Sequence, residues 1–217
     1  MKQEFLEKLP TPLRTILVAF FNWWDDLVAQ SVMSLVWSVA LLTVFLAPPV
    51  TFGIYYVQSQ YIRGENPGLR GMLEGARRYF LKSWQWMLVN LLLVGVLYAS
   101  FQAYGLLGGL SADLGRMFSL FIALFWLTMQ FYTIPFVMIQ ERPSLRLAWR
   151  NSFFLVMASP IYLLALFLFL FLYGVISLLL VFPVILGWIS MVSILGAQAV
   201  KDRLETFRVV ENTERDV

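Results

Sequence analysis

The sequence predicts an all-α, polytopic transmembrane helical bundle, with six spans favoured and with short interfacial amphipathic helices. Hydrophobic residues make up 60% of the 217 positions and charged residues only 13%, whereas a soluble domain carries about 25% charged residues. Four stretches contain no Asp, Glu, Lys or Arg, namely residues 27–62, 83–112, 117–140 and 151–200. A spanning helix needs about 20 apolar residues, so each stretch can hold at least one span. These stretches lack the alternating polarity of transmembrane β-strands.

Residues 1–26 predict an N-terminal interfacial amphipathic segment. Pro12 suits the first turn of a helix that Thr11 caps. Apolar side chains then recur at the helical spacing of an interfacial helix, at Leu13, Ile16, Leu17, Phe20 and Trp24. Asp25 and Asp26 follow, where acidic side chains favour the start of the first span. Two carboxylates alone do not make a metal site.

The topology depends on residues 49–63, which follow a first span at about 27–47. Lys and Arg accumulate on the cytoplasmic side of a membrane. Five spans that omit residues 49–63 would divide the sixteen basic residues twelve to four, whereas six spans divide them fifteen to one. We therefore expect six spans with both termini cytoplasmic. A helix over 49–63 would rise only about 22 Å, against a hydrocarbon core of about 30 Å, so a re-entrant or interfacial segment is the alternative.

Four further spans are expected at about 84–110, 117–139, 153–174 and 181–200, which complete a single transmembrane domain over 27–200. Residues 201–217 form a charged cytoplasmic tail, with a short helical continuation followed by disorder. Asp113 and Arg116 predict an exposed turn pair between two spans. Gly105 and Gly109 fit either a helix-packing GxxxG pair or, better, a helix end.

An internal similarity relates two stretches that lead into spans. "NPGLRGMLEGARRYFLKSW" (residues 66–84) aligns with "RPSLRLAWRNSFFLVMASP" (residues 142–160), and both contain Pro, Leu, Arg and Ser at matching positions. One interpretation is a parallel internal repeat around 49–110 and 117–174. Chance similarity is the other.

Two basic stretches predict an interaction surface on the cytoplasmic side. The first follows Pro67 as an amphipathic helix, with Leu69, Met72, Leu73, Ala76 and Phe80 on its apolar face. The basic residues concerned are Arg70, Arg77, Arg78, Lys82, Arg142, Arg146 and Arg150. One interpretation is binding to a bilayer with anionic headgroups, and the other is docking of a cytoplasmic or membrane transport subunit.

Uncharged polar residues inside the spans predict a cavity. The candidates are Tyr55, Gln58, Asn90, Gln102, Gln130 and Tyr132. They could bind an uncharged solute such as a sugar, with Trp84, Trp86 or Trp126 stacking on it. The alternative is hydrogen bonding between helices, worth about 0.6 kcal/mol and at most about 2. The expected spans contain no ionisable residue, which disfavours proton-coupled transport.

Several classes of function are disfavoured. The chain has no cysteine and no histidine, which excludes disulfides, thiolate nucleophiles and the common zinc sites. It has no phosphate-binding loop, HExxH motif or GxSxG motif. We expect no catalytic residue, no metal, no cofactor and no nucleic-acid partner.

Two stretches resemble the YesL family of bacterial membrane proteins, which carry a domain of unknown function. They are "APPVTFGIYYVQSQYIRGE" from Ala47, followed by "ARRYFLKSW", and "YTIPFVMIQERPSLRLAWRNSFFLVMASP" from Tyr132. The family usually has Leu-Pro where this chain has Ala47-Pro48-Pro49. The resemblance implies a bacterial plasma membrane location and an association with carbohydrate uptake, and it supplies no catalytic residues.

The sequence therefore predicts a non-catalytic integral membrane protein, accessory to a transport or envelope assembly. The alternative is a small facilitator or transporter subunit for an uncharged solute. The basic surface carries the first hypothesis, and the uncharged polar spans carry the second.

Overall fold

The structure is a computed structural model that describes residues 9–180 and 182–215, without the side chains of 179–186 and of 208 onward. Every regular element in this described part is a helix, so the all-α prediction is confirmed. The helices are α2 (Thr11–Asp25), α3 (Leu27–Leu42), α4 (Ala47–Tyr61), α5 (Gly68–Arg78), α6 (Phe80–Leu107), α7 (Gly109–Ile139), α8 (Leu145–Ala158), α9 (Pro160–Leu180) and α10 (Phe182–Arg215).

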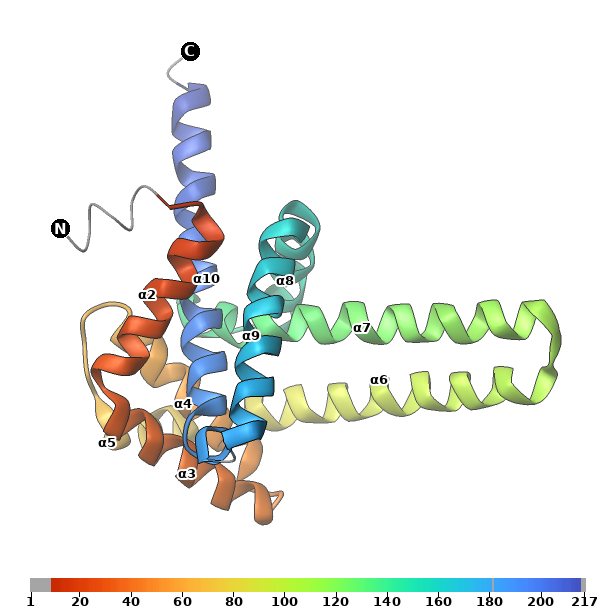
Figure 1. The fold of residues 1–217 in the computed structure, drawn as a ribbon, viewed down its shortest axis with the longest axis horizontal. Coiled ribbons are helices and arrows are strands. Elements are labelled where there is room, and N and C mark those ends of the chain that lie inside the picture. The colour runs from red at the N-terminus through yellow and green to blue at the C-terminus, as the bar shows by residue number, and fades with distance from the viewer. Residues whose placement is uncertain (1–8, 181, 216–217) are drawn as a thin grey trace.

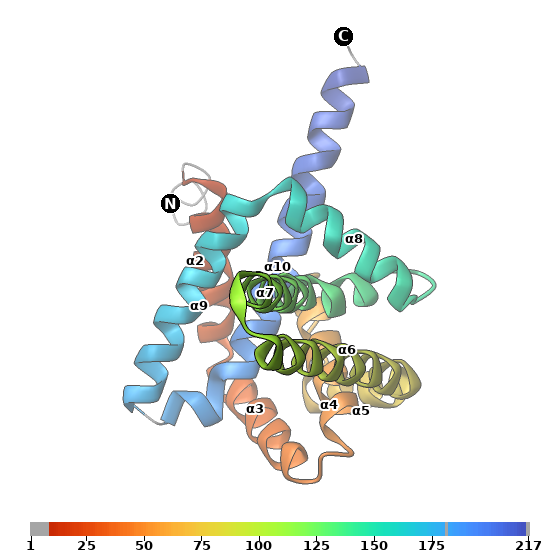
Figure 2. The ribbon, with the colours of Figure 1, turned by 90° about the vertical axis from the view of Figure 1, so that its right-hand side faces the viewer.

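The fold has two parts, a helical bundle and a long hairpin (Figure 1). Helix α10 is central to the bundle, since it contacts α2, α3, α4, α7 and α9. Helices α6 and α7 form the antiparallel hairpin, which projects from one side of the bundle and runs crosswise to α9 and α10. Figure 2 views the hairpin end-on and shows the same crosswise arrangement. Both described ends of the chain lie at the same end of the bundle.

The hairpin turns at two glycines, Gly108 (φ 67°) and Gly109 (φ 82°). This left-handed backbone conformation is one that glycine adopts without steric cost, so the helix-end interpretation of Gly105–Gly109 is confirmed. Beside the turn, Asp113 and Arg116 form an ion pair at 3.8 Å, with side chains 67% and 39% exposed. The predicted exposed pair is therefore present near the tip of the hairpin, but on the first turns of α7 and not in a turn between two spans.

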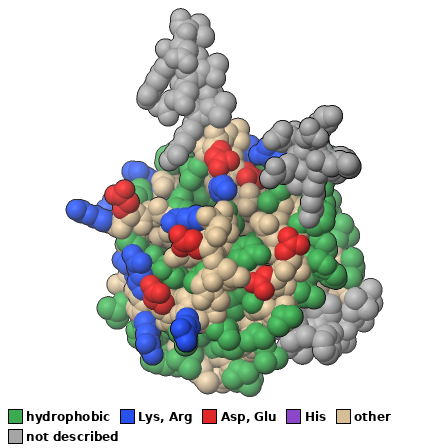
Figure 3. All heavy atoms as spheres, turned by 90° about the vertical axis from the view of Figure 1, so that its left-hand side faces the viewer, with side chains coloured by type: hydrophobic (Ala, Val, Ile, Leu, Met, Phe, Trp, Pro, Cys, Tyr) green, Lys and Arg blue, Asp and Glu red, His purple; other side chains and the backbone are tan. Residues whose placement is uncertain are grey.

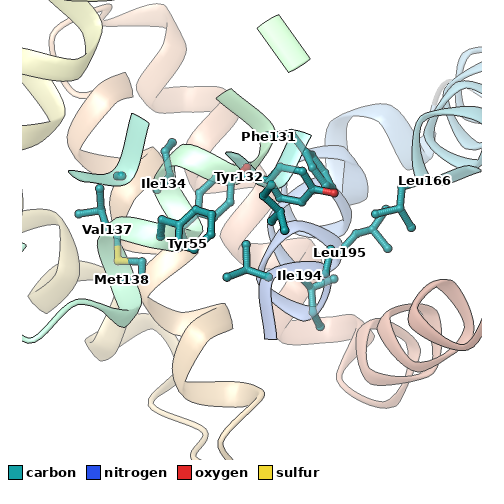
Figure 4. Close-up of a cluster of buried hydrophobic side chains, with 14 of the residues drawn as sticks. Tyr55, Phe131, Tyr132, Ile134, Val137, Met138, Leu166, Ile194 and Leu195 are labelled. Carbon is teal, nitrogen blue, oxygen red and sulfur yellow. The ribbon is translucent and has the colours of Figure 1, made fainter. Parts of the chain in front are cut away.

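The core lies where the second half of α7 enters the bundle. Residues 131–138 of α7 are all buried. Figure 4 shows five of these side chains, Phe131, Tyr132, Ile134, Val137 and Met138, in one buried cluster with Tyr55 of α4, Leu166 of α9, and Ile194 and Leu195 of α10. Tyr132, Leu166 and Ile194 are completely inaccessible. The hairpin is thus anchored in the bundle by one end of α7.

Helix α5 packs closely against α4 through glycines. A Cβ atom at Gly53 would collide with the carbonyl oxygen of Met72, and one at Gly75 would lie 2.6 Å from Cβ of Tyr56. The predicted apolar face of α5 is therefore only partly correct. Met72 is buried, but Leu69 and Leu73 are 43% and 53% exposed, because the glycine side of the helix takes the position against α4.

Within the described part of the chain, three helices are long and apolar enough to cross a membrane: α6, α7 and α9 over Pro160–Leu178. The α2–α3 pair, bent by 90°, makes a fourth if it is one span. The membrane prediction is therefore supported at this coarser level. Helix α4 has only 15 residues, and the segment predicted at 181–200 is part of the 34-residue α10, with side chains 181–186 outside the described residues.

Several predicted boundaries differ from those of the structure. The span expected at 153–174 is divided between α8 and α9 at Ser159 (φ −144°, ψ 55°). Pro160 disfavours helical backbone at the residue before it, which accounts for the break. Helix α7 begins at Gly109, well before residue 117, and α10 continues to Arg215, well beyond the short continuation expected after residue 200. Helix α2, expected at an interface, buries Thr15, Ala19 and Trp23 and packs on α9 and α10.

Candidate functional site

A reciprocal pair of indole–amide hydrogen bonds joins α6 and α7 near the hairpin root. Trp86 Nε1 donates to Gln130 Oε1 at 2.8 Å, and Trp126 Nε1 donates to Asn90 Oδ1 at 2.8 Å. Each amide also donates to the backbone of its own helix, Asn90 to the Trp86 carbonyl and Gln130 to the Trp126 carbonyl. The pattern Trp-x-x-x-amide therefore occurs on both helices, and we call this arrangement the indole–amide clamp.

A cavity of about 630 Å³ lies between the clamp and the bundle. Three of the predicted polar residues line it, namely Tyr55, Asn90 and Gln130, together with the indoles of Trp37, Trp86 and Trp188. The lining is mainly aromatic and aliphatic, and the clamp already uses both amide oxygens. The chemistry suits a largely apolar molecule with few hydrogen-bonding groups.

The other predicted cavity residues lie elsewhere. Gln58 is completely buried and donates to Gln30 of α3 at 2.7 Å. Tyr132 is also completely buried, and its hydroxyl has no hydrogen-bond partner within the described residues. Gln102 lies far out on the hairpin and donates to Tyr98 on the same helix at 3.0 Å. The structure therefore brings together three of the six candidates and separates the other three.

Helices α4, α7 and α10 line the first cavity and also a second one, of about 310 Å³. The residues that line the second cavity come later in each of these helices. They include Ser59, Pro135, Ala197 and Lys201. Close packing separates the two cavities. Pro135 has no N–H, so the Phe131 carbonyl lacks its helical partner. A Cβ atom at Gly196 would lie only 3.1 Å from that oxygen and 3.3 Å from Cγ of Pro135.

The seven predicted basic residues lie on α5, at the start of α6, and on and just before α8. All are exposed except Lys82, which is partly buried. Figure 3 views the side of the molecule opposite the hairpin tip and shows Lys and Arg side chains gathered along one edge, mixed with Asp and Glu. Among the described residues, the ion pair of the structure is Arg116–Asp113. The seven basic side chains are therefore available to a partner.

A buried polar network lies at the end of the bundle near the termini, and it is not among the features predicted from the sequence. Asp202, 4% exposed, accepts hydrogen bonds from Thr15 at 2.5 Å and Gln198 at 2.8 Å. Tyr162 donates to Thr15 at 2.9 Å, and the Arg203 guanidinium lies 3.7 Å from the Tyr162 ring centroid. The sequence places Asp202 in the charged tail after residue 200. The spacing of Gln198 and Asp202, four residues apart on one continuing helix, is the signal for their contact.

The described residues contain no group of three or more His, Cys, Asp or Glu that could hold a metal ion. Near the root, burial raises the pKa of the Tyr79 phenol, so this group remains a neutral hydrogen-bonding group at physiological pH. No family model, curated protein or solved structure matches this chain. The assignment of function therefore depends on the geometry of the chain itself.

Proposed function

We propose that this chain is a non-catalytic integral protein of the bacterial plasma membrane, of the YesL type, and an accessory component of a transport or envelope assembly. The observation that carries the proposal is the set of exposed basic side chains on α5 and α8, which have no ion-pair partner among the described residues. Unpaired guanidinium groups favour carboxylate and phosphate partners. A cytoplasmic or membrane transport subunit with an acidic surface suits them, next to a bilayer with anionic headgroups.

The polar groups around the large cavity support a non-catalytic function. The amide oxygens of Asn90 and Gln130 accept from indoles, and the amide nitrogens donate to backbone carbonyls. A catalytic site needs a nucleophile or a general base positioned against a reacting atom. The groups here are instead used to hold two helices together.

Two topologies agree on the side of the membrane at which each charged residue lies, so the distribution of charge does not distinguish them. In the six-span topology, with both termini cytoplasmic, the turn over 43–46 and the hairpin tip both face outward. If the hairpin alone crosses, only the tip faces outward. Residues 43–46 carry no charge, so the division of fifteen basic residues to one is the same in both. The crosswise hairpin favours the second topology, because helices that cross one bilayer run within about 40° of its normal.

Cysteine labelling in intact cells distinguishes these topologies, since the chain has no native cysteine. Single cysteines replace Val44, in the turn between α3 and α4, and Asp113, at the hairpin tip. Six spans predict that a membrane-impermeant thiol reagent labels both positions, whereas two spans predict labelling at Asp113 alone. A cysteine in place of Lys2 should react only after permeabilisation, and its labelling in intact cells would contradict both.

Purification of the tagged full-length chain from its own membranes tests the accessory function. We expect a stoichiometric partner to co-purify, and Arg70→Glu with Arg77→Glu on α5 to remove it without changing the elution volume of the chain itself. The matched variant Arg142→Glu with Arg146→Glu reports whether α8 contributes. Recovery of the chain alone from mild detergent, at all salt concentrations, would contradict the proposal.

The alternative function, a facilitator for an uncharged solute, has a specific observation in its favour. Helices α4, α7 and α10 line both the cavity of about 630 Å³ and the one of about 310 Å³, and the close contact of Gly196 with Phe131 and Pro135 lies between them along the chain. A facilitator should move an uncharged solute with few hydrogen-bonding groups into liposomes that contain this chain only, and Gly196→Val should stop the flux. Liposomes without flux, together with a co-purified partner, would leave the accessory function.

A further inference from the structure

A polar pocket of about 220 Å³ lies at the hairpin root, next to the smaller of the two cavities above. The end of α4, the junction of α5 and α6, and the end of α7 line it. Its charged lining comes from Arg63, Arg78 and Glu141, and its uncharged polar lining from Tyr56, Ser59, Gln60, Tyr79 and Gln140. Three full charges thus face a small space, two of them positive and one negative.

The charged groups form no ion pair within the described part of the chain. Neither guanidinium pairs with Glu141 or with another described carboxylate, and that of Arg78 lies over the Tyr79 ring, 5.7 Å from its centroid. Gln140 Oε1 accepts from the Ser144 amide at 2.6 Å, but Gln140 Nε2 is buried without a hydrogen-bond partner. A buried donor without a partner is unfavourable. The pocket therefore offers several donors to an oxyanion and one carboxylate to a cation.

The pocket adjoins the cavity of about 310 Å³, since Ser59, Arg63 and Ile139 line both. Ile62, Pro135 and Leu204 form an aliphatic wall of that cavity between α4, α7 and α10, and Lys201 and Glu205 of α10 also line it. A polar pocket next to an aliphatic wall suits an amphiphile better than a soluble ion.

The position along the chain agrees with an amphiphile at the membrane surface. Glu141 directly follows the charge-free stretch of the hairpin that ends at Gln140, and Arg63 lines the pocket beside it. Charges resume where a chain leaves the hydrocarbon region, and tyrosines gather at the same level. The phosphates of membrane lipids lie at this boundary.

We infer that this pocket binds the headgroup of an aminophospholipid, a phosphodiester that carries a primary amine. Arg63, Arg78 and the Nε2 group of Gln140 donate to the phosphate, Glu141 accepts from the ammonium group, and the aliphatic wall of the adjoining cavity takes the first part of an acyl chain. The site goes beyond the accessory function and does not depend on a protein partner, because Arg78 is the one arginine of the α5 and α8 set that lines it.

Native mass spectrometry of the full chain in detergent, with defined lipids added, tests the site. We expect one phosphatidylethanolamine per chain, held at least about tenfold more tightly than phosphatidylglycerol or phosphatidylcholine, since hydrogen bonds to charged groups favour the fully paired ligand by such factors. Arg63→Gln with Gln140→Ala should lower that affinity about tenfold or more. The exposed Arg70→Gln, outside the pocket, should leave it unchanged. Equal retention by the double variant would overturn the inference.

Glu141→Gln tests the amine. We expect it to abolish the preference for phosphatidylethanolamine over phosphatidylglycerol while both lipids still bind. A wild-type chain that prefers phosphatidylglycerol would overturn the assignment of Glu141. Free phosphoethanolamine should not displace the lipid at millimolar concentration, and displacement would show that a soluble phosphate ester is the ligand instead. Arg63→Gln with Gln140→Ala should still capture the protein partner, so failure of the lipid site and failure of the accessory function are distinguishable.

Discussion

Helix α4 and helix α6 belong to the same chain but meet opposite surroundings. Ten of the 15 residues of α4 are buried, whereas α6 buries only Ser83 along its 28 residues. Their glycines differ in the same way. A Cβ atom at Gly53 in α4 would collide with the backbone of α5, while one at Gly95 in α6 would meet no atom within 4 Å.

The difference separates the core of the bundle from the hairpin. The core obtains its contacts from within, through close helix packing and buried hydrogen bonds, although α9 also leaves large apolar side chains such as Ile161 exposed. The hairpin satisfies its backbone internally, as a membrane requires, but leaves large apolar side chains such as Leu92 and Leu106 at 71% and 90% exposure. An apolar surface of this extent marks a membrane or protein contact, and the length and hydropathy of α6 and α7 suit a membrane. Substitutions of buried residues in the bundle should therefore lower the free energy of unfolding much more than substitutions in the hairpin.

The largest effect is expected from valine at Gly53. The new side chain would force α5 away from α4, because the obstacle is a backbone carbonyl, and overpacking of this kind costs about 3 kcal/mol or more. Gly95→Val is the matched change in the hairpin and should alter stability by less than about 0.5 kcal/mol. Thermal unfolding in detergent, followed by intrinsic tryptophan fluorescence, measures both. Equal losses at the two positions would remove the contrast between the helices.

A smaller loss is expected from Asp202→Leu. Thr15 and Gln198 would lose their acceptor in a buried site, which costs about 1–3 kcal/mol. Glu205→Gln, on the same helix but exposed, should change stability by less than about 0.5 kcal/mol. The same unfolding assay compares them. If the two variants behave alike, the network does not stabilise the packing of α2 on α10.

The clamp joins the two regions, and its loss should have an intermediate effect. Trp126→Phe leaves the Asn90 oxygen without its indole donor, and a hydrogen bond between membrane helices is worth about 0.6 kcal/mol and at most about 2. A double-mutant cycle with Asn90→Leu should give a coupling energy in that range. Gln102→Leu, farther out on α6, should have no measurable effect. A zero coupling energy would mean that the helices are held by apolar contact alone.

The smallest effect is expected at the hairpin tip. Asp113→Asn removes an exposed ion pair, and such pairs contribute about 0–1 kcal/mol. Unfolding temperature should therefore stay within the error of the measurement at low and high salt. A clear decrease in the unfolding temperature at low salt would show that this ion pair stabilises the fold.

The sequence predicts the helical class and the hairpin well, because charge-free stretches and the Gly108–Gly109 turn are local signals. It predicts the division of the bundle poorly. The break at Ser159–Pro160 divides one expected span, and the glycines of α4 and α5 gain meaning only when the two helices are placed together. The charge count does not distinguish six spans from two, because the turn over 43–46, which faces outward only in the six-span topology, carries no charge.

The candidate site is predictable to a similar degree. Asn90 and Gln130 can be recognised as polar residues in apolar helices, but their pairing with Trp126 and Trp86 depends on the register of α6 against α7. Gln30, the partner of Gln58, and Asp202 were not selected, because Gln30 lies near the start of a helix and Asp202 begins a charged segment. The unpaired Gln140 amide that defines the lipid pocket depends on tertiary packing, which composition does not reveal.

The indole–amide clamp also fixes a length. Its two hydrogen bonds run in opposite directions between α6 and α7, so sliding one helix past the other in either direction would break both. The clamp residues lie 17–22 residues from the turn at Gly108 and Gly109, or about 30 Å, which is close to the hydrocarbon thickness of a bilayer. If the hairpin crosses a bilayer, as proposed, the clamp fixes the distance between the bundle and the face at which Asp113 and Arg116 reach water.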